Sequence, residues 1–141
     1  MCMIVDANLC SVVFKKTTVI AYQKLRQTIF ENKLTLIHGG QLTKEYAKAG
    51  VLPIVAMLSQ SGKAIKIADA LIDAELAHAT QHCTSNDTHV IALARADRKR
   101  GHVLCTDDQA LQTDFKNKAL IDKPRGTIYS STRHKASLAN C

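Results

Sequence analysis

The sequence has no tryptophan, and its 141 residues include only three tyrosines, three phenylalanines and two prolines. So few aromatic side chains exclude the base-stacking platform that lines many grooves for single-stranded nucleic acid. No apolar run approaches the length of a bilayer-spanning helix. The short apolar run at the N-terminus is interrupted by Asp6 and is not preceded by a positive charge, so we expect no signal peptide.

Cysteine and histidine do not form a recognisable metal-binding motif. The five cysteines are an odd number without close pairing, which favours free thiols and a cytoplasmic location. His78, His82 and Cys83 lie close together but lack a fourth ligand at the spacing of a zinc site. We expect these histidines to be exposed or half-buried, and His89, inside another predicted helix, to be packed or to support a site rather than to react.

Charge and length suggest one basic domain. Lys and Arg number 19 against 12 Asp and Glu, giving a net charge of +7. Such a surface favours an anionic partner such as nucleic acid, although a solvated basic surface without a partner gives the same balance. We predict one compact domain over residues 1–130, followed by a basic, flexible tail over residues 131–141.

Short apolar strands alternate with helices along the chain. Strands are predicted at 3–5, 34–37, 103–105 and 127–129, and helices at 21–30, 42–49, 54–58, 68–79, 87–96 and 109–115. Residues 65–67 fit either element. This alternation predicts an α/β fold with a mainly parallel central sheet that is covered on both faces.

Acidic residues follow two of the predicted strands. Asp6 ends the first strand, and the pair Asp107-Asp108 ends the strand at 103–105. In parallel sheets the ligand site lies beyond the carboxyl ends of the strands, so these acids should meet in one crevice. Taken singly, each acid has an ordinary explanation: a turn for Asp6, a helix cap for Asp87 or the Asp pair, and a solvated helix position for Glu45. Taken together, clustered carboxylates repel one another unless a cation neutralises them, and their hard oxygen ligands predict Mg²⁺ or Mn²⁺.

Four segments resemble, in order and spacing, the successive motifs of PIN-domain nucleases. They are Ile4-Val5-Asp6-Ala7-Asn8, then Glu45 on a helix after the second strand, then DTHVIALA from Asp87, and LCTDDQAL from Leu104. The resemblance covers about residues 3–129. It implies a three-layer α/β/α sandwich and a metal-dependent endoribonuclease that leaves 5′-phosphate and 3′-hydroxyl ends. Single-domain, VapC-like members of this length are often toxins of bacterial toxin–antitoxin pairs, so the resemblance also implies an antitoxin partner, and such toxins commonly form homodimers.

The resemblance also assigns roles to residues. The acids that match Asp6, Glu45, Asp87 and Asp108 hold the metal in the family, and Asn8 and Thr106 match positions that support the site. The Thr-x-Asp pattern favours Asp108 over Asp107, which stays a less certain ligand. Asn86 stands where some relatives carry another acid, so one or two ions remain open.

Basic residues follow the acidic motifs and are candidates for gripping the RNA backbone. They are Arg95, Arg98, Lys99, Arg100 and Lys116. The alternative is solubilising charge at helix ends.

Two other functions compete with nuclease activity. One is a degenerate nuclease scaffold that only binds RNA or protein. The other is an aspartyl phosphotransferase, although such enzymes usually have a second Asp where this chain has Asn8.

Overall fold

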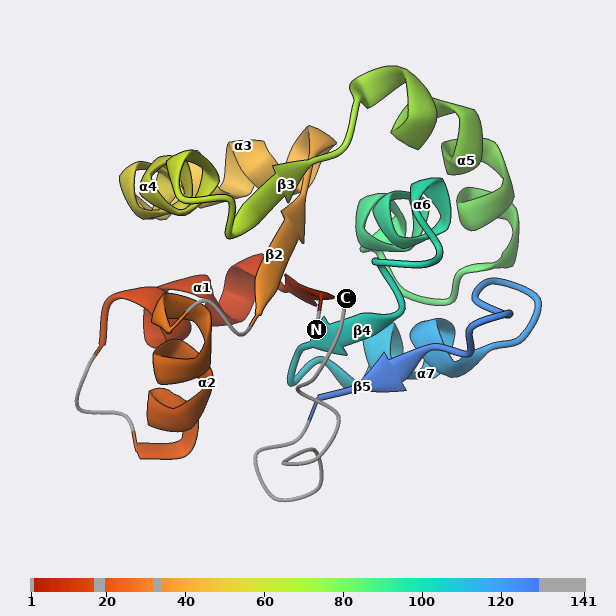
Figure 1. The fold of residues 1–141 in the computed structure, drawn as a ribbon. Coiled ribbons are helices and arrows are strands. Elements are labelled where there is room, and N and C mark those ends of the chain that lie inside the picture. The colour runs from red at the N-terminus through yellow and green to blue at the C-terminus, as the bar shows by residue number, and fades with distance from the viewer. Residues whose placement is uncertain (1, 17–19, 32–33, 130–141) are drawn as a thin grey trace.

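The computed structural model describes residues 2–16, 20–31 and 34–129, which form a five-stranded parallel sheet flanked by seven helices (Figure 1). This confirms the predicted α/β class and is consistent with a three-layer α/β/α sandwich. The predicted tail over residues 131–141 lies outside the described residues. The elements in chain order are β1 (Cys2–Val5), α1 (Ala7–Phe14), α2 (Ile20–Phe30), β2 (Thr35–His38), α3 (Gly40–Lys48), α4 (Leu52–Gln60), β3 (Ala64–Lys66), α5 (Asp69–His82), α6 (Thr88–Ala96), β4 (Val103–Cys105), α7 (Gln109–Lys116) and β5 (Thr127–Ile128).

The strand order is β3-β2-β1-β4-β5, which puts β1 at the centre. Strand β1 pairs in parallel with β2, where Cys2 lies opposite Thr35, and with β4, where Ile4 lies opposite Leu104. The chain runs outward from β1 to β3 and then crosses back to β4 and β5. The order therefore reverses beside β1, and in sheets of this kind ligands bind at the point of reversal, outside the carboxyl ends of the strands.

The central strands are buried on both faces. All four residues of β1 and all three of β4 are buried apolar side chains. A strand that is apolar on both faces is stable only where helices cover the sheet on both sides, and right-handed crossovers in opposite directions place them there. Helix α6 is enclosed as well: its residues 90–94 are all buried, because it packs against both α5 and α3.

Two details go beyond the predictions. The ambiguous segment at 65–67 contributes the edge strand β3, which pairs in parallel with β2 from Leu36 opposite Ala64. Helix α6 has Asp87 as its N-cap residue, and the Ser85 hydroxyl accepts from the Asp87 N–H over 3.4 Å. The pairing of β3 with β2 joins residues that lie far apart in the sequence.

Within the residues that the structure describes, no helix combines the length and the apolar character needed to cross a lipid bilayer.

Candidate functional site

Asp6 lies at the end of β1 and is almost fully buried, with 2% of its surface exposed. Its N–H donates to the Cys105 carbonyl of β4 over 2.9 Å, so it lies at the point of strand reversal. The hydroxyl of Thr106 donates to the Asp6 carboxylate over 2.8 Å. Although Asp6 is the N-cap residue of α1, its side chain makes no capping hydrogen bond to that helix. The ordinary explanation of Asp6 as a capping or turn residue therefore does not account for its buried carboxylate.

Thr106 also connects Asp6 to Asp108. Its Oγ1 accepts a hydrogen bond from the Asp108 N–H at 3.1 Å, and its carbonyl accepts one from Gln112 Nε2 at 2.9 Å. Asp108 Oδ1 in turn accepts from the Leu111 N–H at 3.1 Å, so Asp108 caps α7 with one carboxylate oxygen. Thr106 thus holds one acid by its side chain and positions the backbone of the other.

Asp87 is presented at the start of α6 by a loop that Asp114 fixes. The carboxylate of Asp114, which is 1% exposed, accepts from the N–H and hydroxyl of Thr84 at 2.9 and 2.8 Å, and from the Ser85 N–H at 2.8 Å. Burial would raise the pKa of Asp114, but these hydrogen bonds outweigh it and lower the pKa below its ordinary value. The Asp87 side chain makes no capping bond to α6, so its carboxylate is not used by the helix that it starts.

The four acids with predicted metal-binding roles share one electrostatic neighbourhood. Burial is the largest cause of the raised pKa of Asp87, and the negative charge of Asp6 is the next. Asp108 and Glu45 raise that pKa further, while His89 opposes them. Like charges that raise a pKa act over short range, so the fold brings Asp6, Glu45 and Asp108 into the neighbourhood of Asp87.

Glu45 faces His89 across the α3–α6 contact. The Oε1 atom of Glu45 lies 3.2 Å from Nε2 of His89, and the two side chains are 28% and 17% exposed. The Nε2 atom is buried and has no hydrogen-bond partner in the described part of the chain. The two groups are therefore at ion-pair distance without the geometry of a hydrogen bond.

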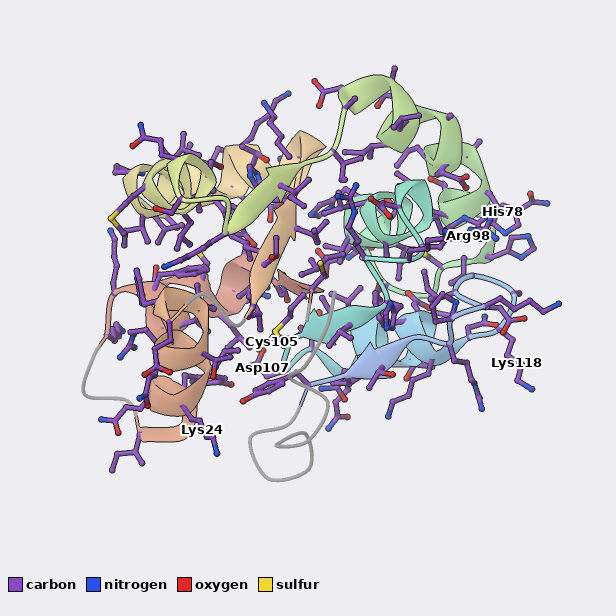
Figure 2. All side chains as sticks on the ribbon, in the orientation of Figure 1. Lys24, His78, Arg98, Cys105, Asp107 and Lys118 are labelled. Carbon is purple, nitrogen blue, oxygen red and sulfur yellow. The ribbon has the colours of Figure 1, made fainter. Side chains whose placement is uncertain are left out.

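Asp107 and Asn8 lie outside this neighbourhood. Asp107 is exposed, and Figure 2 shows it beside Cys105 at the end of β4, toward α2. After burial, the charges of Cys105 and Asp107 raise the pKa of Tyr22 in α2, whereas Asp107 is not among the charges that shift Asp87. Asn8 is exposed in the first turn of α1, and no hydrogen bond in the described structure joins its side chain to the acids. Of the two adjacent aspartates, Asp108 is the one whose charge raises the pKa of Asp87.

The structure does not bring the five basic candidates to the acids. Helices α6 and α7 begin at Asp87 and Asp108 and run away from them, and nine helical residues span about 13 Å. In Figure 2, Arg98 lies beside α6, well away from Asp107 at the end of β4. The five are thereby carried to the amino edge of the sheet: Arg95, Arg98, Lys99, Arg100 and Lys116.

Two of these basic residues are also engaged in contacts of their own. Arg95 donates to Glu75 over 2.8 Å and to the Leu120 carbonyl over 2.5 Å. Arg100 donates to Asp97 over 2.6 Å. These contacts hold helix ends and loops in place, and none of them involves the four acids.

Tyr46 is a supporting residue that the sequence did not reveal. It is fully buried on α3, next to Glu45 in the chain, and its hydroxyl donates to the Val5 carbonyl directly before Asp6. Asp114 was missed as well. Neither a tyrosine nor an aspartate inside a predicted helix gives a signal of such a role, because both contacts join residues at least 29 positions apart.

The donor set fits a hard divalent cation in its chemistry. Asp6, Glu45, Asp87 and Asp108 offer carboxylate oxygens that repel one another, a repulsion that a bound cation removes. As the side chains lie, however, no three His, Cys, Asp or Glu of the described residues are arranged to hold an ion. Small rotations of the side chains would therefore have to accompany binding.

No known family model matches the chain, and neither do the curated proteins or the solved structures with which it was compared. The resemblance to PIN-domain nucleases accordingly rests on the motifs in the sequence.

Proposed function

We propose that this protein is a metal-dependent endoribonuclease whose centre is formed by Asp6, Glu45, Asp87 and Asp108. One observation carries the proposal: Asp6 and Asp87 both occupy helix N-cap positions, yet neither side chain caps its helix. The charge of Asp6, together with those of Asp108 and Glu45, instead raises the pKa of Asp87. Acids that are held together at an energetic cost, at the point where α/β sheets bind ligands, are typical of a functional site.

The surrounding residues hold the acids in place. Thr106 orients Asp6 and the backbone of Asp108, while Asp114 fixes the loop before Asp87. Three helices, α1, α6 and α7, begin at these acids, so the positive end of each helix dipole lies at one of them. That field favours both the carboxylates and the phosphate of a bound nucleic acid.

The four acids would hold one or two Mg²⁺ or Mn²⁺ ions. When bound, such an ion lowers the pKa of a coordinated water and stabilises negative charge on phosphate oxygens. The residues of the chain itself bind the ion, keep Asp6 in a buried and defined orientation, and align the phosphodiester with the helix N-termini.

Cleavage of total cellular RNA in Mg²⁺ or Mn²⁺ tests this proposal. We expect Asp6→Asn to slow cleavage by more than about 100-fold, since central ligands affect activity at least as strongly as the groups that support them. Asp73→Asn is the matched control, because Asp73 is exposed on α5. We expect this variant to cut RNA at the wild-type rate. Thermal unfolding of each variant checks that it is folded. Equal rates for Asp6→Asn and wild type would sink the proposal.

We further propose, on the resemblance to PIN-domain toxins, that the protein acts in the bacterial cytoplasm and is inhibited by a small antitoxin. The antitoxin would cover the acidic crevice, with an arginine reaching the carboxylates. Expression of the wild-type chain in a bacterium should then arrest growth, and expression of Asp6→Asn should not. Growth arrest by both proteins alike would indicate a toxicity unrelated to the centre.

A second candidate is a binding module that has lost its chemistry. The observation in its favour is that, across the described residues, the acids do not stand ready as a ligand set. Calorimetry separates the two functions: a nuclease should bind Mn²⁺ at millimolar concentration or below, and a degenerate scaffold should not.

A further inference from the structure

His89 faces the acidic cluster with an unsatisfied nitrogen. Its Nε2 atom is buried, has no hydrogen-bond partner in the described structure, and lies 3.2 Å from Glu45 Oε1. A buried polar atom without a partner costs free energy, so such an atom calls for an explanation, of which a bound ion is one. His89 lies on α6, two residues after Asp87, and its charge acts on that carboxyl group.

The relation of the two side chains differs from that of an ordinary ion pair. In an ion pair the imidazole N–H points at the carboxylate oxygen, whereas here the two atoms are close without that alignment. Two donors at right angles on one octahedral ion, each about 2.1 Å from it, stand about 3.0 Å apart. The observed separation of 3.2 Å therefore suits two neighbouring ligands of a single cation.

We infer that His89 supplies an imidazole nitrogen to the metal ion beside Glu45, which makes the centre a mixed nitrogen and oxygen site. This inference rests on the proposed function, because it adds a ligand to the same ion. It changes the expected metal. Mg²⁺ binds almost solely through oxygen, whereas first-row ions such as Mn²⁺ accept imidazole readily. The centre therefore selects Mn²⁺ over Mg²⁺, a choice that the carboxylates alone do not make.

A histidine that only pairs with Glu45 predicts something different. Loss of a pairing partner would change the orientation of Glu45 and weaken Mg²⁺ and Mn²⁺ binding by similar factors. Loss of a nitrogen ligand would weaken Mn²⁺ binding selectively. The ratio of the two affinities thus separates the roles, and it is insensitive to a general loosening of the site.

The experiment is calorimetry on the untagged full chain after removal of metal, titrated separately with MnCl₂ and MgCl₂. The His89→Gln variant keeps a polar group of similar length, and we expect Mn²⁺ affinity to fall by about 10-fold to 100-fold. Mg²⁺ affinity should fall by less than about 3-fold, because that ion does not depend on the nitrogen. His82→Gln, an exposed histidine on α5, is the matched control and should leave both affinities unchanged.

Pulsed electron paramagnetic resonance of bound Mn²⁺ is a second measurement. It tests the wild-type protein directly, so its main result does not depend on how well a variant folds. We expect the wild-type protein to show coupling to a directly bound nitrogen, which disappears in His89→Gln and persists in His82→Gln. Absence of that coupling in the wild type, or an equal loss of both affinities in His89→Gln, overturns the inference. If the wild type binds Mn²⁺ in a way that Asp6→Asn abolishes, such a result leaves the proposed function standing. If the wild type binds neither ion, both fall together.

Discussion

The hydroxyl of Thr106 is predicted to stabilise both the fold and the acidic cluster. It donates to the buried carboxylate of Asp6 at 2.8 Å and accepts from the Asp108 N–H at 3.1 Å. A hydrogen bond to a charged group contributes about 1.5–3 kcal/mol, and a bond between neutral groups about 0.5–1.5 kcal/mol. Thr106→Val removes both bonds while keeping the shape of the side chain, so the free energy of unfolding should fall by about 2–4 kcal/mol.

Urea denaturation followed by circular dichroism measures this loss. A decrease of 3 kcal/mol corresponds to about 10 °C in Tm for a domain of this size. Thr106→Ser keeps the hydroxyl and is the matched control, expected to lose about 1 kcal/mol for the missing methyl group. RNA cleavage should fall by about 10-fold to 100-fold in the valine variant only, because Asp6 loses its orientation. A valine variant as stable and as active as the serine variant would refute the assigned role of the hydroxyl.

Three further predictions concern ionisable groups that are buried or half-buried. Asp114→Asn should lower the free energy of unfolding by about 2–3 kcal/mol at pH 7, because an amide nitrogen replaces one of the oxygens that accept from the loop N–H groups. Since the pKa of Asp114 is lowered in the folded state, the difference in stability between wild type and variant should disappear as the pH falls below about 4. Urea titrations at several pH values measure this difference. Burial, with a contribution from Lys66, lowers the pKa of His38 to about 4, below its unfolded value near 6.5. His38 therefore becomes protonated at a lower pH in the folded state than in the unfolded state. The wild type should therefore lose about 3 kcal/mol between pH 6.5 and pH 4, and His38→Gln should show a clearly flatter profile of unfolding free energy against pH. Asp87→Asn should raise Tm in EDTA at pH 7, because it removes a carboxyl group whose pKa is raised by burial and by neighbouring acids. Addition of Mn²⁺ should raise the Tm of this variant less than that of the wild type. A lower Tm of the variant in EDTA would contradict the clustering of the acids.

The order of elements followed from the sequence because buried parallel strands leave a strong local signal. Residues 3–5 and 103–105 are continuous apolar runs; Asp6 follows the first directly, and Asp107 follows the second after Thr106. Strand β3 was ambiguous for the opposite reason. Its three residues, Ala64–Lys66, are too few to show a period, and only pairing with β2 makes them a strand. Local patterns predict elements well where burial is continuous and poorly at short edges.

The site was predictable where topology alone decides the contact. Asp6 and Thr106 end neighbouring parallel strands, so their contact follows once β1 and β4 are adjacent. The meeting of Glu45 with His89 requires the packing of α3 on α6, which no local pattern encodes. The basic residues were expected near the acids because they follow them in sequence. A helix that starts at the carboxyl edge runs back to the amino edge, however, and it carries residues of its last turn such as Arg95 away.

The central claim is that the clustered acids form a metal-dependent centre that cuts RNA. Mapping the ends of RNA cut by the purified chain, with Mn²⁺ and with EDTA, tests it most directly. The account predicts new 5′-phosphate ends that form with Mn²⁺, vanish with EDTA and are absent for Asp6→Asn. Ends that persist in EDTA, or that form equally with Asp6→Asn, would contradict it.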